Sequence, residues 1–144
     1  MNRFLLDTNL LVYSLRNDPK WDVVCRTYAI GENNNFVSVV SLGEIWSLSI
    51  RNQWGPRRIE QLQRINQSFI IVDINIENII RLYAEIDAYS QGKLKGKPLG
   101  TTARNMGKND LWIAATASAL ELSLLTTDRD FDHLTPSFLN LYKI

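Results

Sequence analysis

Short apolar segments alternate along the chain with longer segments of helical periodicity. Four segments have the composition and length of strands, and they cover 3–6, 35–40, 69–74 and 123–128. Because their apolar residues run together instead of taking every second position, these strands are expected to be buried on both faces. Helices are expected between them, so the pattern predicts a mostly parallel sheet covered by helices on both faces.

The segments between these strands have the periodicity and the end signals of helices. The expected helices cover 8–16, 20–32, 41–53, 57–67, 75–91 and 109–121. Gly55-Pro56 separates two of them into a helical hairpin, and a loop rich in Gly and Lys extends to Gly107. A last strand is expected at the sheet edge in 139–144. No repeat or linker divides the chain, which predicts a single α/β domain over 1–144.

The composition fits a protein of the cytoplasm. A chain of 144 residues can bury a sizeable core without disulfides or a structural metal. The single cysteine, Cys25, shares an expected helical face with Trp21, Val24 and Tyr28, which predicts core packing in a reducing compartment. No apolar run reaches the ~18 residues of a membrane span, and no membrane association is expected.

Four acidic residues stand where a strand ends or a helix begins. Asp7 follows the first strand and Asp128 the fourth, whereas Glu44 and Asp110 are placed in the first turns of helices. Acidic residues are common helix caps, so one such position alone indicates nothing further. The carboxyl ends of parallel strands, however, lie along one edge of a sheet, and the four side chains are therefore expected to converge.

Converging carboxylates need protons or a cation. Two carboxylates ~5 Å apart repel by about 3 kcal/mol at an effective dielectric constant of ~20. Several such pairs are a large penalty beside a typical domain stability of ~5–15 kcal/mol. Oxygen donors without Cys or His select a hard divalent ion. We therefore expect a Mg²⁺ (or Mn²⁺) site at Asp7, Glu44, Asp110 and Asp128.

The net charge of +1 conceals an uneven distribution. If four carboxylates are gathered in one site, the rest of the chain carries +1 plus four, or +5. Basic residues concentrate in the helical hairpin and in the loop before Gly107. The basic residues expected to contact an anionic ligand are Arg51, Arg57, Arg58, Lys93, Lys95, Lys97, Arg104 and Lys108. Soluble loops also carry lysines, but two basic segments together favour an anionic polymer as the ligand.

A carboxylate-held divalent ion beside basic segments indicates hydrolysis of phosphate esters. Such an ion binds a nonbridging phosphate oxygen and activates a bound water, whose proton a nearby carboxylate accepts. The sequence contains no GxSxG motif, no Cys–His pairing and no phosphate-binding glycine loop. Nothing in it supports covalent catalysis.

Four motifs, in order along the chain, resemble the PIN-domain family and particularly the VapC-type toxins of bacterial toxin–antitoxin pairs. They are "LLDTN" after the first strand, a Glu opening the third helix, "ND" followed by "IAATA", and "LLTTDRDF". The resemblance covers nearly the whole chain. It implies a Rossmann-like three-layer α/β/α sandwich and a Mg²⁺- or Mn²⁺-dependent endoribonuclease. It also implies a cognate antitoxin and a homodimer as partners.

The resemblance places the same four acids in the site. It implies that Asp7 and Asp110 are the core metal ligands and that Glu44 and Asp128 complete the shell, one of them orienting the attacking water. The supporting positions are Asn9, Asn109, Thr126, Asp130 and Asp132. Asn109 and Thr126 are expected to position carboxylates by hydrogen bonds. Asp130 and Asp132 can each replace or supplement Asp128, so the fourth acid is left open.

Two tryptophans and the single histidine complete the expectations. Trp46 shares a helical face with Ser49 and Ile50 and is expected in the core, whereas His133 is expected at the surface. Trp54 lies in a polar turn among arginines, where an exposed ring can stack on a base or contact a partner. In the PIN-domain toxins an antitoxin tail docks near the third and fourth helices, so Trp54 is the expected partner contact.

Three other functions fit the sequence less well. A PIN-like module that binds RNA without cleaving it would lack the metal, and the intact set of acids argues against it. A haloacid-dehalogenase-type phosphatase needs a second Asp two residues after Asp7, where this chain has Asn9. A receiver domain needs paired acids after the first strand and a phosphoacceptor after the third, which Asp73 alone does not provide.

Overall fold

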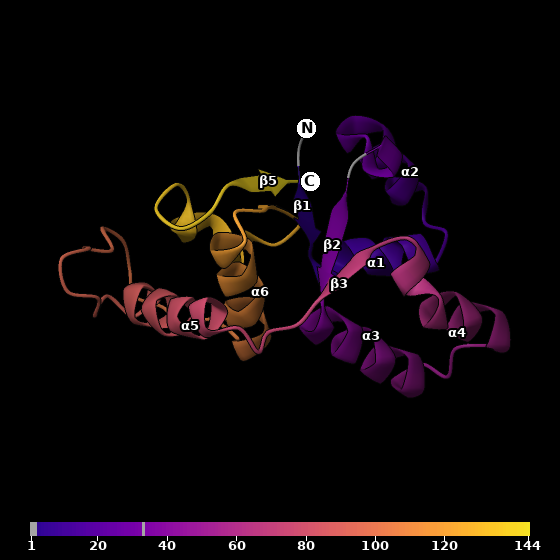
Figure 1. Cartoon of the computed structure of the whole chain (residues 1–144), viewed down its shortest axis with the longest axis horizontal. Coiled ribbons are helices and arrows are strands. Elements are labelled where there is room, and N and C mark those ends of the chain that lie inside the picture. Colours follow the sequence, from indigo (N-terminus) through magenta and orange to yellow (C-terminus); the bar gives the residue numbers. More distant parts are fainter. Residues whose placement is uncertain (1–2, 33) are drawn as a thin grey trace.

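The computed structural model describes residues 3–32 and 34–144 and contains a five-stranded sheet (Figure 1). The strands are β1(Phe4–Leu6), β2(Asn35–Ser38), β3(Ile70–Val72), β4(Ser123–Thr126) and β5(Leu141–Lys143). They lie in the order β3-β2-β1-β4-β5. All four described pairings are parallel. The last segment forms the expected strand at the sheet edge.

The helices follow the expected order along the chain. They are α1(Thr8–Leu15), α2(Pro19–Tyr28), α3(Val39–Arg51), α4(Pro56–Gln63), α5(Glu77–Ser90) and α6(Lys108–Ala119), with the 3₁₀ helices η1(Ile30–Glu32), η2(Ile65–Gln67) and η3(Arg129–Leu134). Among the described helices, none is both long and apolar enough to cross a membrane.

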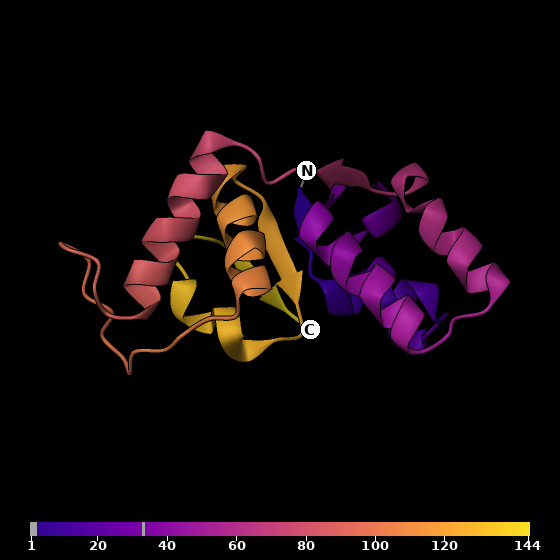
Figure 2. The same cartoon turned by 90° about the horizontal axis from the view of Figure 1, so that it is seen from below.

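Adjacent residues of the central strands point into two separate cores. Leu5 and Leu124 pack with α5 and α6, whereas Phe4, Leu6 and Leu125 pack with residues of α1 to α4. The two groups of helices accordingly lie on opposite sides of the strands (Figure 2). Because both faces are covered, the strands are apolar at consecutive positions. This arrangement confirms the Rossmann-like three-layer α/β/α sandwich.

Three local expectations were wrong, each for a physical reason. The third strand was expected to be buried, but β3 is an edge strand and Ile70 is 47% exposed. The second helix ends at Tyr28 because Ala29 adopts a left-handed conformation with φ of 51°. α3 begins at Val39, two residues early, because Ser38 Oγ accepts a hydrogen bond from Val40 N at 3.1 Å. Glu44 therefore lies in the second turn of α3.

The order of the strands creates a crevice at the carboxyl edge of the sheet. From β1 the chain continues to β2 on one side and returns to β4 on the other, which makes the β1–β4 boundary a topological switch point. Asp7 N donates to Leu125 O at 2.9 Å and fixes the end of β1 against β4. The first and fourth acids thereby leave the sheet side by side.

Candidate functional site

Asp7 is the most deeply buried carboxylate of the acidic site. Its side chain is only 5% exposed, directly after β1. Oδ1 accepts a hydrogen bond from Thr8 N at 2.8 Å, and Oδ2 accepts one from Thr126 Oγ1 at 2.6 Å. Burial raises the pKa of Asp7, the two hydrogen bonds oppose this rise, and the charges of Glu44 and Asp128 add to it. The fold thus holds this carboxylate in one orientation although it lies in a poorly solvated place.

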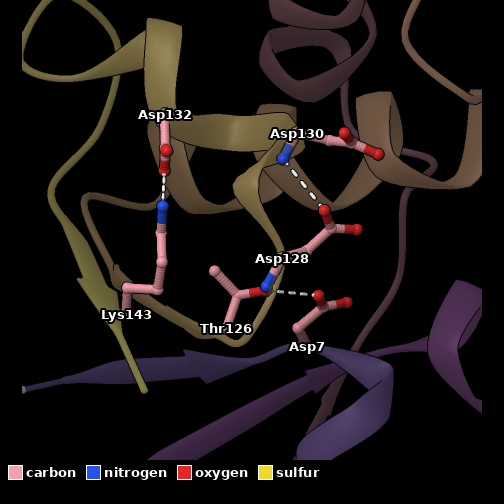
Figure 3. A network of polar contacts seen from close by, with 6 residues as sticks. All are labelled: Asp7, Thr126, Asp128, Asp130, Asp132 and Lys143. Carbon is pink, nitrogen blue, oxygen red and sulfur yellow. Dashed lines mark hydrogen bonds and ion pairs between the residues drawn. The ribbon is translucent and has the colours of Figure 1, made fainter.

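Thr126 connects the acid of β1 to the acids that follow β4. While its hydroxyl donates to Asp7, the same oxygen accepts a hydrogen bond from Asp128 N at 3.0 Å. Asp128 Oδ1 then accepts from Asp130 N at 2.9 Å and caps η3. Figure 3 shows this continuous path from Asp7 to Asp130. The expectation that Thr126 positions a carboxylate is confirmed for Asp7.

Glu44 is oriented by hydroxyl groups that sequence reasoning did not assign to it. Thr8 Oγ1 lies 2.8 Å from Glu44 Oε1 and 3.0 Å from Ser41 Oγ. Thr8 has one hydroxyl hydrogen, so when it donates to Glu44 it accepts from Ser41. Neither Thr8 nor Ser41 had an expected role in the site. The available signal was that Ser41 lies three residues before Glu44, on the same face of a helix.

The pKa of Asp110 depends on its burial and on the charges of the other acids in the cluster. It lies in the first turn of α6 and is partly buried. Burial, followed by the charges of Asp7, Asp128, Asp130 and Glu44, raises the pKa of Asp110 to about 7. Four carboxylates from other parts of the chain therefore act on this one group, which places all five in one region.

The oxygen atoms of this cluster fit a divalent cation. Carboxylate oxygens of Asp110, Asp128 and Asp130 lie within 4.8 Å of one another. Among the residues that the structure describes, this is the group able to hold a metal ion, and its donors are all oxygens. Hard ions such as Mg²⁺ and Mn²⁺ prefer this donor type, and a cation would relieve the repulsion that raises the pKa of Asp110. Asp7 lies next to the group, with each oxygen already accepting one hydrogen bond.

Of the expected supporting residues, some lie in this carboxylate cluster and others do not. Asp130 is a member, whereas Asp132 forms an ion pair with Lys143 and is directed away from the other acids (Figure 3). Asn9 Nδ2 donates to Thr127 Oγ1 at 3.4 Å, beside the site. Asn109 was expected to hydrogen bond a carboxylate, but in the described part of the chain it makes no such bond and is exposed.

The expected burial of Trp46 and the expected exposure of Trp54 and His133 were wrong, whereas the partner contact at Trp54 stays a prediction. Trp46 is 37% exposed, whereas Trp54 is partly buried against the core, with Arg58 Cζ 5.1 Å from its ring centroid. His133 is partly buried, its Nε2 lies 2.7 Å from Ser90 Oγ, and its ring stacks on Tyr89. Helical periodicity groups side chains into faces, but it does not show which face meets another element.

The basic residues do not form one surface. The helical hairpin that carries Arg57 and Arg58 and the loop that carries the lysines lie at opposite ends of the molecule (Figure 1). Arg51 lines a groove together with Glu44, and Arg104 lines a smaller one together with Asp130. Of the predicted basic contacts, these two arginines share a groove with an acid of the cluster.

Comparisons with known proteins agree with this geometry. The chain is 25% identical over 133 residues to Ribonuclease VapC1 of Haemophilus influenzae strain R2866, which covers 92% of each chain. A structure of VapBC2 from Rickettsia felis bound to a promoter DNA fragment matches with a TM-score of 0.74 at 20% identity, covering 99% of this chain and 98% of that one. A structure of VapBC-1 from nontypeable Haemophilus influenzae matches with a TM-score of 0.72 at 22% identity, covering 98% and 97%. The family model of the PIN domain matches residues 4–135, and the chain therefore belongs to the PIN domain family.

Proposed function

We propose that this protein is a metal-dependent endoribonuclease and the toxin of a VapBC-type toxin–antitoxin pair. The observation that carries the proposal is the convergence of five carboxylates, at a site where burial and the charges of the other four raise the pKa of Asp110 to about 7. Such crowding of carboxylates destabilises the folded state, and a bound cation would offset the repulsion between them. The relative named a ribonuclease supports RNA as the substrate.

Asp110, Asp128 and Asp130 would hold the Mg²⁺ or Mn²⁺ ion, with Asp7 next to them. When bound, such an ion supplies an activated water and neutralises the charge that develops on the phosphate. Asp7 contributes a carboxyl group in a fixed orientation, because Thr8 and Thr126 hold both of its oxygens. The fold therefore sets the geometry of the site before substrate arrives.

Glu44 is the residue best placed to accept a proton. Thr8 binds Oε1, and this hydrogen bond orients the carboxylate while Oε2 makes no hydrogen bond within the described chain. A carboxylate held in this way can take the proton of a water that attacks phosphorus. Glu44 also lines the groove between α3 and α6, so it faces the space open to substrate.

A protein partner is part of the same proposal. Trp46 and Ile50 lie one turn apart on α3 and are 37% and 74% exposed, and Ile76 and Ile80 near the start of α5 are 40% and 46% exposed. Exposed apolar residues of this size favour an interface with an antitoxin or with a second copy of the chain. Structural neighbours described as toxin–antitoxin complexes support the antitoxin. An RNA-cleaving toxin of this kind would act in the cytoplasm.

The test is cleavage of total RNA by the purified protein with Mg²⁺ or Mn²⁺, with EDTA and the Asp110→Asn variant as controls. We expect discrete fragments that require both the ion and Asp110. If the protein binds the ion and RNA but leaves the RNA intact, the non-catalytic binding module is the correct function. Cleavage that persists in EDTA would contradict metal dependence.

A further inference from the structure

A groove of about 500 Å³ runs beside the acidic cluster, between α3 and α6. These two helices lie side by side in Figures 1 and 2. The residues that line the groove and matter here are Gly43, Glu44, Ser47, Arg51, Asn109 and Trp112. The α3 residues among them share one helical face, as do the two from α6. The groove is therefore lined by one acid of the cluster, Glu44, and by Asn109, the residue before Asp110.

The groove pairs one arginine with this one carboxylate. Arg51 lies in the last turn of α3, and its Nε donates to Ser47 Oγ at 3.3 Å, which directs the side chain along the helix. Its terminal nitrogens stay available in an exposed position. A guanidinium group binds phosphate oxygens in a forked geometry. The groove thus offers a phosphate-binding group about two helical turns from Glu44.

Trp112 gives the groove an aromatic wall. Its ring packs on Tyr83 of α5, with centroids 4.2 Å apart and planes at 39°, so the indole is supported from behind. Asn109 lies one turn earlier on α6, exposed, with an amide that can donate and accept hydrogen bonds. A supported indole beside a free amide is suited to stack on a nucleobase and to contact its edge.

A second groove, beside Asp130 of the cluster, also contains one arginine and one carboxylate. It has a volume of about 310 Å³ and is lined by Arg104, Asn105 and Asp130, among others. The acids of the cluster therefore have one arginine-containing groove beside Glu44 and one beside Asp130. A polymer with one negative charge per repeat can place a phosphate at each arginine while a third lies over the acids.

We propose that the groove between α3 and α6 binds the nucleotide next to the scissile phosphate, with Arg51 on its phosphate and Trp112 stacked on its base. This assignment rests on the proposed ribonuclease function and adds to it the residues that select the substrate. A protein segment from a partner is the competing occupant. The two arginine-containing grooves, one beside Glu44 and one beside Asp130, favour RNA, because a strand that is cut in the middle needs contacts to more than one of its phosphates.

The charge contact is tested by comparing Arg51→Gln with Arg26→Gln. Both arginines are exposed and lie in the last turn of a helix, and each variant removes one positive charge, but of the two only Arg51 lines the groove. We expect Arg51→Gln to raise KM for RNA about tenfold or more and to reduce the salt dependence of binding by about one phosphate contact. Arg26→Gln should change KM less than about twofold.

The space itself is tested at Gly43. A Cβ atom built at this position meets no atom within 4 Å, so the fold accommodates a side chain there. Gly43→Ala should raise the melting temperature, because alanine favours the helix. Gly43→Leu extends into the groove and should raise KM strongly in a protein that is still folded. Trp112→Leu should raise KM about 5- to 150-fold, the range of measured base stacking.

These outcomes separate the inference from the proposed function. If wild type cleaves RNA, and Arg51→Gln and Gly43→Leu behave like Arg26→Gln and Gly43→Ala, the inference is wrong and the proposed function stands. If those variants cleave normally but lose the binding of a co-expressed partner protein, the groove is a protein site. If wild type neither binds nor cleaves RNA, both proposals are wrong.

Discussion

The two halves of the acidic cluster are held in different ways. Asp7 and Glu44 receive hydrogen bonds from Thr126 and Thr8, and both are fixed by the folded chain alone. Asp110, Asp128 and Asp130 lie close together and face one another without a cationic side chain among the described ion pairs. The fold thus completes one half of the site, and under the proposed function an ion would complete the other half.

The largest expected effect concerns which acids belong to the cluster. Asp110→Asn should lower the rate of RNA cleavage at least about 100-fold, because it removes a carboxylate on which the other four act. Asp132→Asn is the control, since Asp132 follows β4 as Asp128 and Asp130 do but pairs with Lys143. We expect it to change the rate by less than about threefold. Equal losses in the two variants would contradict the division between these acids.

The next effect concerns the half that the fold completes. Thr126→Val removes the donor to Asp7 and the acceptor of Asp128 N at a fully buried position. We expect a loss of about 1–3 kcal/mol in the free energy of unfolding, measured by urea denaturation, together with slower cleavage. Thr127→Val, one residue on, should cost less than about 0.5 kcal/mol, since that hydroxyl only accepts a 3.4 Å bond from Asn9.

Asp110, in the half of the site proposed to hold the ion, should make the free energy of unfolding of the metal-free protein depend on pH. The pKa of Asp110 is 3.8 when unfolded and about 7 when folded, so between these values the folded state binds more protons. Stability in EDTA should therefore be greatest below about pH 4 for this group and fall by about 1–2 kcal/mol as the pH rises to 7. The Asp110→Asn variant should lack this part of the decline, which denaturation at several pH values can measure. Parallel curves for the two proteins would show that the acids do not interact as described.

The smallest effect concerns the hydroxyl pair at Glu44. Thr8→Val removes the hydrogen bond to Oε1 and leaves the carboxylate in place, so kcat should fall about 2- to 12-fold with KM nearly unchanged. Thr8→Ser keeps the hydroxyl and should restore most of the rate. If serine were as slow as valine, packing of the Thr8 methyl group, not orientation of Glu44, would be responsible.

The sequence predicted the features that depend on the hydrophobic periodicity of one segment or on one local signal at its end. The strand ends at Asp7 and Asp128 and the helix start before Asp110 could be located because apolar runs stop there. Their convergence followed from the geometry of parallel strands alone. The exact start of α3 could not be predicted, since the serine cap competes with the end of β2.

The parts that the sequence did not predict depend on contacts between distant segments. Trp46 was expected in the core because α3 is apolar on more than one face, and only the packing of Ile45 toward the strands shows which face is covered. The removal of Asp132 from the cluster depends on Lys143, which β5 brings beside it. The role of Trp112 depends on its neighbour Tyr83 in α5.

The most direct test of the central claim is a calorimetric titration of Mn²⁺ into the metal-free protein at pH 7, repeated in two buffers of different ionisation enthalpy. We expect binding of Mn²⁺ to release about half a proton per ion. Asp110, with a pKa of about 7, is about half protonated at pH 7 and must lose its proton to bind the ion. Asp110→Asn should bind Mn²⁺ much more weakly and release no proton. Binding that is equally strong in wild type and Asp110→Asn, or no binding to wild type, would contradict the account.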